Sequence, residues 1–261
     1  MVYPKLVTTN FDGIRVKDFL LQHKEIKSAA ILFFHGFGDL LLFHPFYIQL
    51  KKELPNINFE LYTNRPGLNN IVENIKYSEN AEHIINVDVI FQIQYPEPIV
   101  VDDEVTCTKP VHCNNRELGL LSIPKDYPVH NIDKNTNKLV AVHLDATSSP
   151  GCTSPDKETK EKILNTILQA GYYPLDIHEA ISKIKNIEIA YSLINSSAIF
   201  IGVLSGPLVL AMSMKPSKVI CLEKKLAIKR YTSQKVIKCS IHPFKPKELL
   251  EAIKLCINNS I

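Results

Sequence analysis

Apolar and polar residues alternate along the chain with two periods, one typical of strands and the other of amphipathic helices. Short runs rich in β-branched residues predict strands at 30–34, 59–63, 83–87, 139–144, 173–177, 199–203 and 218–222. Helices are expected between and after them, at 45–53, 69–76, 157–170, 188–196, 207–213 and 245–258. Strands that alternate with helices in this way favour parallel sheets built from βαβ units, and therefore an α/β fold.

The alternation is interrupted once, which predicts a division into two domains. Residues 95–136 are rich in Pro, Asp, Asn and Lys, and 130–138 has the polar composition of a linker. We therefore expect an N-terminal Rossmann-like domain over 1–136, in which 1–28 is an extension before the first strand. A second Rossmann-like domain is expected over 137–261.

Composition narrows the classes of function. The chain has 261 residues, of which 45% are hydrophobic and 22% charged, as in an ordinary globular protein. Its net charge of +3 is too small to indicate a nucleic-acid or membrane surface. No CxxC pair occurs among the cysteines, and Cys107, His112 and Cys113 supply at most half of a metal site. Free thiols in a reducing compartment and no bound metal are therefore expected.

One uncharged stretch is long enough to cross a membrane. Residues 189–214 contain no charged side chain. Gly206 and Pro207 interrupt the stretch and would break a spanning helix, so a buried strand, a turn and a helix are expected instead. The N-terminus lacks a basic segment followed by an apolar one, so no signal peptide is predicted. A cytoplasmic protein is expected.

The turn between the strand at 199–203 and the next helix has the residues of an anion site. Ser205 suits the helix N-cap, Gly206 lets a ligand approach the backbone, and Pro207 suits the first helical turn. A helix N-terminus carries roughly half a positive charge and unpaired N–H groups, which favour a phosphate. The alternative is a strand-to-helix turn without a ligand.

The first glycine-rich turn, His35-Gly-Phe-Gly-Asp39, suits two chemistries. An α/β-hydrolase uses an HGxG loop to bind an oxyanion, and a nucleotide-sugar enzyme uses a Gly-Asp turn to hold a catalytic acid. The hydrolase also needs a GxSxG motif, and the nearest candidate around Ser205 has the wrong spacing. Asp39 is therefore the candidate acid, and its alternative role is a helix N-cap.

Four segments in order resemble glycosyltransferase family 9, the ADP-heptose:lipopolysaccharide heptosyltransferases. FIGVLSGPLVLAM (200–212) resembles the donor-side motif, and Gly38-Asp39, the apolar run 40–43 and Pro45 resemble the N-terminal motif. Residues 112–120 and 140–157 resemble two further segments of the family. The resemblance implies a GT-B-like fold, with two Rossmann-like domains whose parallel sheets face a central cleft.

The resemblance also implies an activity. It is that of an inverting, metal-independent hexosyl- or heptosyltransferase, which needs no cofactor and uses a nucleotide-diphosphate sugar as co-substrate. Asp39 would be the catalytic base that takes the proton of the acceptor hydroxyl. The donor would bind to Thr147, Ser148, Glu179, Ser205, Gly206 and Pro207, with Glu179 at the ribose, and the acceptor would approach Gly36, Gly38 and His44.

The chain departs from the family at three donor-side positions. Leu204 replaces an acid, Val209 replaces a histidine, and Cys152 stands where a lysine is usual. These changes leave the donor sugar open, and they keep a non-catalytic nucleotide-sugar-binding protein as an alternative. The acceptor is also open among a saccharide, a lipid-linked saccharide, a protein and a nucleic acid. A location at the inner face of a membrane is compatible with these acceptors.

Overall fold

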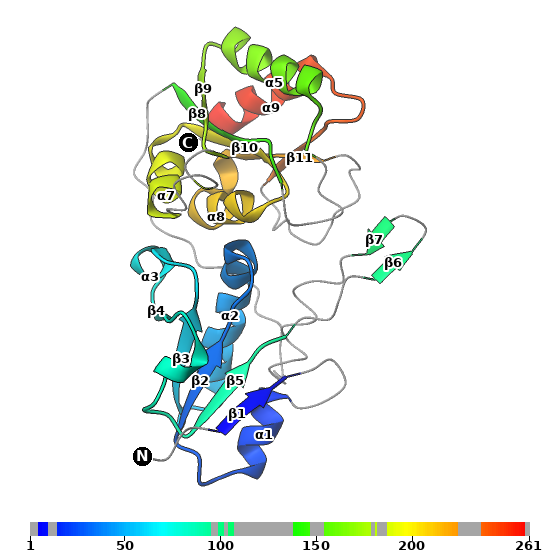
Figure 1. Ribbon diagram of the computed structural model, residues 1–261. Coiled ribbons are helices and arrows are strands. Elements are labelled where there is room, and N and C mark those ends of the chain that lie inside the picture. The colour runs from blue at the N-terminus through cyan, green and yellow to red at the C-terminus, as the bar shows by residue number, and fades with distance from the viewer. Residues whose placement is uncertain are drawn as a thin grey trace. The chain divides into compact units, whose positions relative to one another are not determined.

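The computed structural model divides into two compact units, Met1–Pro128 and Val129–Ile261 (Figure 1). It describes residues 5–9, 15–94, 99–101, 104–106, 138–146, 154–178, 181, 187–223 and 236–258. Each unit contains a five-stranded sheet in which all strand pairs are parallel. The predicted α/β class is therefore confirmed. The domain boundary predicted near residue 136 and most of the linker lie outside the described residues.

The N-terminal sheet has the strand order β1-β5-β2-β3-β4. Its strands are β1 (Lys5–Thr8), β2 (Ser28–Leu32), β3 (Asn58–Thr63), β4 (Ile75–Tyr77) and β5 (Val89–Gln92). The helices are α1 (Val16–Gln22), α2 (Phe37–Glu53), α3 (Leu68–Ile71) and the 3-10 turn η1 (Ala81–His83). A small antiparallel pair, β6 (Ile99–Val101) and β7 (Glu104–Thr106), follows. Residues 5–8 and 16–22, which the sequence analysis placed in an extension, thus form a strand and a helix.

Three predictions for this unit are wrong. The helix expected to begin at Pro45 begins at Phe37, because the buried apolar residues before and after Pro45 hold the helix against the core despite the missing hydrogen bond. The helix expected over 69–76 ends at Ile71, and Asn74 adopts a left-handed conformation (φ 61°) just before β4. The strand expected over 83–87 lies later in the chain, as β5, which begins at Val89. The Asp88 carboxylate sets this start, because it accepts hydrogen bonds from the Lys27 and Ser28 backbone N–H groups, both at 2.8 Å.

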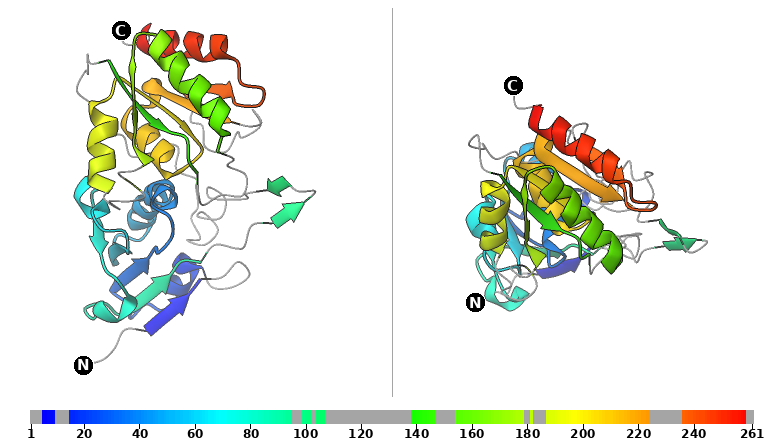
Figure 2. Two further views of the ribbon diagram at one scale, coloured as in Figure 1. Left: turned by 45° about the horizontal axis from the view of Figure 1, so that its top comes forward. Right: turned by 90° about the horizontal axis from the view of Figure 1, so that it is seen from above.

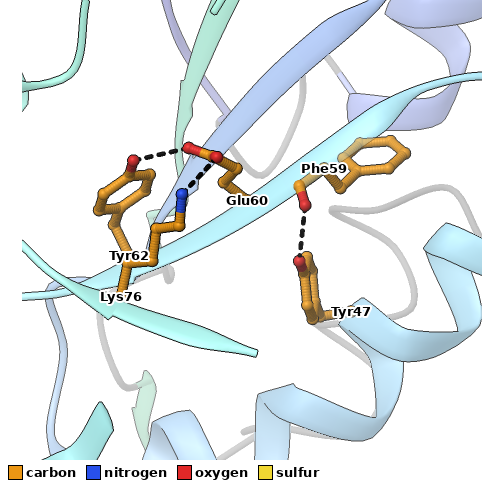
Figure 3. A network of polar contacts seen from close by, with 5 residues as sticks. All are labelled: Tyr47, Phe59, Glu60, Tyr62 and Lys76. Carbon is orange, nitrogen blue, oxygen red and sulfur yellow. Dashed lines mark hydrogen bonds and ion pairs between the residues drawn. The ribbon is translucent and has the colours of Figure 1, made fainter. Parts of the chain in front are cut away.

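Polar contacts hold α2 and β4 to strand β3, which lies between β2 and β4 in the sheet (Figure 3). The Tyr47 hydroxyl of α2 donates to the Phe59 carbonyl at 3.0 Å, and burial raises the pKa of Tyr47 to about 12. The Tyr62 hydroxyl donates to the Glu60 carboxylate at 2.6 Å, and Lys76 of β4 pairs with the same carboxylate. These contacts fix the orientation of α2, whose first turn carries Asp39.

The C-terminal sheet has the strand order β12-β11-β10-β8-β9. Its strands are β8 (Leu139–His143), β9 (Tyr173–Asp176), β10 (Ile199–Val203), β11 (Val219–Glu223) and β12 (Ile237–Ser240). The helices are α5 (Lys157–Gln169), α7 (Ile187–Ser196), α8 (Gly206–Met214) and α9 (Pro246–Asn258), with the 3-10 turn η2 (Pro216–Lys218). The predicted strands and helices of this unit are confirmed to within two residues at each end, and among the described elements β12 and the short turn η2 were missed.

The two faces of the C-terminal sheet carry different side chains. Alternate strand residues such as Val142, Ile201 and Leu222 pack with Ile163 of α5 and Ile253 of α9 in one apolar core. Figures 1 and 2 show α5 and α9 side by side on this face. The intervening strand residues point to the opposite face, on which α7 and α8 pack. This alternation decides which polar residues lie on the α8 side.

The uncharged stretch 189–214 is divided among α7, β10 and α8. The buried ammonium group of Lys215, directly after α8, donates to the carbonyls of Asn195 and Ser197 at 3.0 and 2.5 Å and so ties the end of α7 to α8. Burial lowers the pKa of Lys215 to about 8. Within the described ranges, no helix has both the length and the apolar character needed to cross a membrane.

Candidate functional site

The turn from β10 into α8 has the geometry expected of an anion site. Ser205 is the N-cap residue in an extended conformation, and α8 begins at Gly206 with Pro207 in its first turn. The Ser205 side chain makes no capping hydrogen bond to the helix. It therefore leaves the first N–H groups of α8, those of Gly206 and Leu208, to another acceptor. The structure thus places Ser205, Gly206 and Pro207 together at the carboxyl edge of the sheet, where open α/β sheets bind ligands.

The Ser205 hydroxyl is held by a histidine that the sequence analysis missed. The Ser205 Oγ donates to the Val203 carbonyl at 3.0 Å and lies 3.2 Å from Nδ1 of His143, the last residue of β8. A hydroxyl has one proton, so while Ser205 donates to Val203 it can only accept from His143, in the tautomer that carries its hydrogen on Nδ1. The chain of contacts is therefore imidazole to hydroxyl to carbonyl.

His143 is neutral in this environment. Its side chain is buried, and burial lowers the pKa of His143 to about 4, with a further lowering from His178 and opposing effects of Asp176 and Asp145. The rings of His143 and His178 have their centroids 5.6 Å apart. A neutral imidazole adds no positive charge beside α8, so the helix N-terminus supplies the attraction for an anion.

Further polar groups line the ends of β8 and β9. Asp145 pairs with Lys160 of α5 at 2.5 Å, and the Ala146 N–H donates to the Ser154 hydroxyl at 3.0 Å. These contacts hold the chain on both sides of 147–153. Thr147, Ser148, Cys152 and Glu179 themselves lie outside the described residues, so their roles at the donor stay predictions.

The two apolar departures from the family lie in the described part of the chain. Leu204 is half-buried at the end of β10, and Val209 is buried in α8. Neither side chain has a polar group for a phosphate or a sugar hydroxyl. A buried acid that the sequence analysis missed, Glu223, ends the neighbouring strand β11.

In the N-terminal unit, Asp39 lies in the first turn of α2. Gly36 is the N-cap, and a Cβ atom at Gly36 would lie 3.1 Å from Oδ2 of Asp39. The carboxylate therefore folds back over the N-cap residue, and a methyl group there would displace it by a few tenths of an ångström. The adjacent loop is anchored by His35, whose Nε2 lies 2.8 Å from the Ile93 carbonyl and whose own carbonyl accepts from Arg65 at 3.1 Å.

The residues predicted on the acceptor side lie close together in sequence but differ in exposure. Gly36 is partly exposed, whereas Gly38 is buried in the first turn of α2. His44 is buried on the same helix, and its Nε2 lies 2.9 Å from the Glu73 carbonyl. This contact ties α2 to the segment after α3. A contact between His44 and an acceptor stays a prediction.

Two residues after β3 were also missed. Asn64 has a buried side-chain oxygen for which the described structure shows no hydrogen-bond partner, and the neighbouring Arg65 is exposed. Both follow the end of a strand next to β2, so they lie at the same sheet edge as the loop before Asp39. The sequence signal that could have pointed to them is the polar pair Asn64-Arg65 directly after a predicted strand.

In the described ranges, no group of three or more His, Cys, Asp or Glu side chains could hold a metal ion. Cys107, His112 and Cys113, which could form half of a site, lie outside those ranges. The described cysteines, Cys221, Cys239 and Cys256, are buried thiols that form no disulfide with one another. Burial raises the pKa of Cys239 and of Cys256 to about 12, so neither is a ready nucleophile.

Comparison with known proteins gives a match in structure only. No family model and no curated protein matches the sequence. The structure of a family 9 glycosyl transferase from Veillonella parvula matches with a TM-score of 0.60 at 12% identity, over 90% of this chain and 98% of that one. Escherichia coli ADP-heptose LPS heptosyltransferase II matches with a TM-score of 0.62 at 11% identity, over 90% and 100%.

The chain has the fold of the family 9 glycosyltransferases. A third structure, an iron-containing dodecameric glycosyltransferase of enterotoxigenic E. coli, matches with a TM-score of 0.55 at 12% identity, over 81% of this chain and 62% of that one. The GT-B-like fold implied by the sequence resemblance is thereby confirmed. At these identities the likeness establishes the fold, and activity has to be argued from the residues of this chain.

Proposed function

We propose that the protein transfers a sugar from a nucleotide-diphosphate sugar to an acceptor hydroxyl, with inversion at the anomeric carbon and without a metal. The observation that carries the proposal is the Ser205-Gly206-Pro207 turn, with its uncapped helix N-terminus beside neutral His143. This turn lies at the carboxyl edge of a parallel sheet in a protein with the fold of nucleotide-sugar enzymes.

The donor diphosphate rests against the N-terminus of α8 in this proposal. The N–H groups of Gly206 and Leu208 donate to its oxygens, and the helix dipole favours its charge. The Ser205 hydroxyl can rotate its proton from the Val203 carbonyl to a phosphate oxygen, while His143 keeps the oxygen in place. Thr147 and Ser148 bind the other phosphate oxygens, and Glu179 binds the ribose.

Asp39 acts as the general base. It takes the proton of the acceptor hydroxyl as the acceptor oxygen bonds to the anomeric carbon. The bond from that carbon to the diphosphate breaks at the same time, so a nucleoside diphosphate leaves and the configuration inverts. The N–H groups of α8 stabilise the charge that develops on the leaving group, which removes the need for a metal. A positioned base contributes about 10²–10⁴ in rate.

The non-catalytic nucleotide-sugar-binding protein is a second candidate, because Leu204 and Val209 offer no polar group to the donor. The α/β-hydrolase has less support. Its serine must donate to a histidine, whereas the Ser205 hydroxyl donates to the Val203 carbonyl. Ser205 also has the extended backbone of an ordinary N-cap, with φ −163°.

A thermal-shift panel of ADP-, GDP-, UDP- and dTDP-sugars tests the proposal. A ligand at 100 times its Kd adds about 2.7 kcal/mol to the free energy of unfolding, which is easily measured. We expect sugars of one nucleotide to raise the melting temperature and to be turned over slowly in water. A panel with no shift at millimolar concentrations contradicts the proposal, and binding without any turnover favours the second candidate.

A further inference from the structure

Glu223 is the last residue of β11 and lies at the same sheet edge as the Ser205 turn. The pairing of β10 with β11 sets Val203 opposite Leu222, so Glu223 is level with the residue that precedes Ser205. Leu222 belongs to the core on the α5 and α9 face, so its neighbour Glu223 points to the face on which α8 packs. In a right-handed β-α-β unit, the helix after β10 begins at this edge between β10 and β11. Glu223 is therefore placed beside the first turn of α8.

In the described part of the chain, contacts are made by one of the two carboxylate oxygens of Glu223. The ammonium group of Lys238, on the neighbouring strand β12, lies 3.4 Å from Oε1, and the Cys221 thiol donates to the same oxygen at 3.5 Å. The other oxygen, Oε2, is buried and has no hydrogen-bond partner among the residues that the structure describes. The whole side chain is 3% exposed.

A buried carboxylate oxygen without a donor is costly, because water has been lost and nothing replaces it. Burial accordingly raises the pKa of Glu223, although Lys238 and Cys221 oppose this effect. A purely structural ion pair would use both oxygens or leave the second in water. A ligand that brings a hydroxyl or N–H group to Oε2 removes the cost.

The two halves of this site select one kind of ligand. The N-terminus of α8 attracts an anion, whereas the carboxylate of Glu223 repels one and accepts hydrogen bonds from hydroxyl groups. Gly202 is in register with His143 on one side and Cys221 on the other, and the Phe200 ring packs over it, so the ligand would lie beyond Gly202 at the sheet edge. A molecule that carries both a diphosphate and a polyol satisfies both halves.

We infer that Glu223 binds a hydroxyl group of the donor, from its ribose or from its transferred sugar, beside the Ser205-Gly206 turn. The inference rests on the proposed function and adds to it a residue that selects for the hydroxyl groups of the donor. It also supplies a polar contact in a unit where Leu204 and Val209 supply none.

Calorimetry with the Glu223→Gln variant tests the inference. The probes are inorganic diphosphate, then ADP, GDP and UDP, and then ADP-glucose, GDP-mannose and UDP-glucose. Loss of a charge-assisted hydrogen bond weakens binding by about tenfold or more, so hydroxyl-bearing probes that bind the wild type should lose that much. Binding of inorganic diphosphate should not weaken, since it has no hydroxyl to lose and since Gln removes the charge that repels it. Weakening of both nucleoside diphosphate and nucleotide sugar assigns the contact to the ribose, and weakening of the nucleotide sugar alone assigns it to the transferred sugar.

Two further variants serve as a second test and as a control. Glu223→Asp retains the charge beside Lys238 but withdraws the carboxylate, and it should show the same selective loss if Glu223→Gln unfolds too easily for calorimetry. Glu248→Gln makes the matched change in an exposed ion pair of α9 and should alter no affinity. Unchanged affinities in both Glu223 variants, or equal losses for all probes including inorganic diphosphate, overturn the inference. A wild-type protein that binds no probe overturns the proposed donor site, and the inference with it.

Discussion

Nδ1 of His143 lies 3.2 Å from Oγ of Ser205, across 62 residues of sequence. The contact joins the carboxyl ends of the neighbouring strands β8 and β10 on the face that α8 covers. His143 donates to the hydroxyl, which in turn donates to the Val203 carbonyl. The N-cap residue of α8 is thus held by the sheet, and the first N–H groups of the helix are left for a ligand.

The first prediction concerns the pH dependence of stability. Burial lowers the pKa of His143 to about 4 in the folded protein from an ordinary value of 6.5, so the unfolded chain binds more protons between these values. The contribution of His143 to the free energy of unfolding is therefore complete above pH 6.5 and is lost as the pH falls towards 4. We expect the free energy of unfolding to fall by about 3 kcal/mol over this range because of His143. Urea denaturation at pH 7 and pH 4, with His143→Gln as the reference, measures it. Equal pH slopes in the two proteins would show that His143 is not buried as described.

A second prediction concerns the space at Gly202. A Cβ atom there would lie 2.8 Å from the Phe200 ring and 2.9 Å from the His143 carbonyl. Gly202→Ala should therefore lower the free energy of unfolding by about 1–3 kcal/mol and weaken nucleotide binding, because the His143 end of β8 must shift. Gly171→Ala is the control: Gly171 has φ +82° and open space around it, so its substitution costs stability through backbone strain alone. Loss of nucleotide affinity in both variants, or in neither, would contradict the placement of the donor beside His143.

A third prediction tests the α8 turn directly. Gly206→Val puts a branched side chain where the diphosphate is proposed to approach the backbone, and it should abolish nucleotide binding in a folded protein. Gly206→Ala should weaken binding less, because its side chain is smaller. Calorimetry with the nucleotide sugar that binds the wild type gives the affinities, and circular dichroism checks the fold. Undiminished affinity in folded Gly206→Val would remove the donor from this turn.

The C-terminal unit could largely be predicted from the sequence because its signals are local. The apolar strand at 199–203 is followed by Ser-Gly-Pro, which ends a strand and begins a helix whatever surrounds it. The N-terminal unit was harder. Proline at 45 indicated a helix start, but the helix continues through it because ten of its residues are buried in the fold.

The candidate site was predicted only in part, for a related reason. Ser205 and Asp39 lie in turns with recognisable residues, so a single segment reveals them. His143 and Glu223 end apolar strands, and their importance depends on strand register and on which face α8 covers. No local pattern contains that information. The signal that could have found them is a polar residue at the carboxyl end of an apolar parallel strand.

A fourth prediction concerns Gly36, the N-cap residue of α2 that lies against the Asp39 carboxylate. A methyl group at Gly36 would lie 3.1 Å from Oδ2 of Asp39, so Gly36→Ala should displace the carboxylate while leaving the helix intact. We expect turnover to fall by about tenfold or more with little change in donor affinity, because a misplaced base loses part of its effect. Unaltered turnover in Gly36→Ala would indicate that the position of the Asp39 carboxylate does not matter to the reaction.

The central claim is that the protein transfers sugar with Asp39 as its base, and the hydrolysis rate of Asp39→Asn tests it most directly. The release of nucleoside diphosphate from the bound nucleotide sugar is followed with water as the acceptor, which needs no knowledge of the natural one. Asp18→Asn, a like change in the first turn of α1, is the control and should keep the wild-type rate. We predict that Asp39→Asn keeps its melting temperature and donor affinity and loses at least about 100-fold in rate. A rate close to that of the wild type would make Asp39 a residue of the helix start only and would contradict the mechanism.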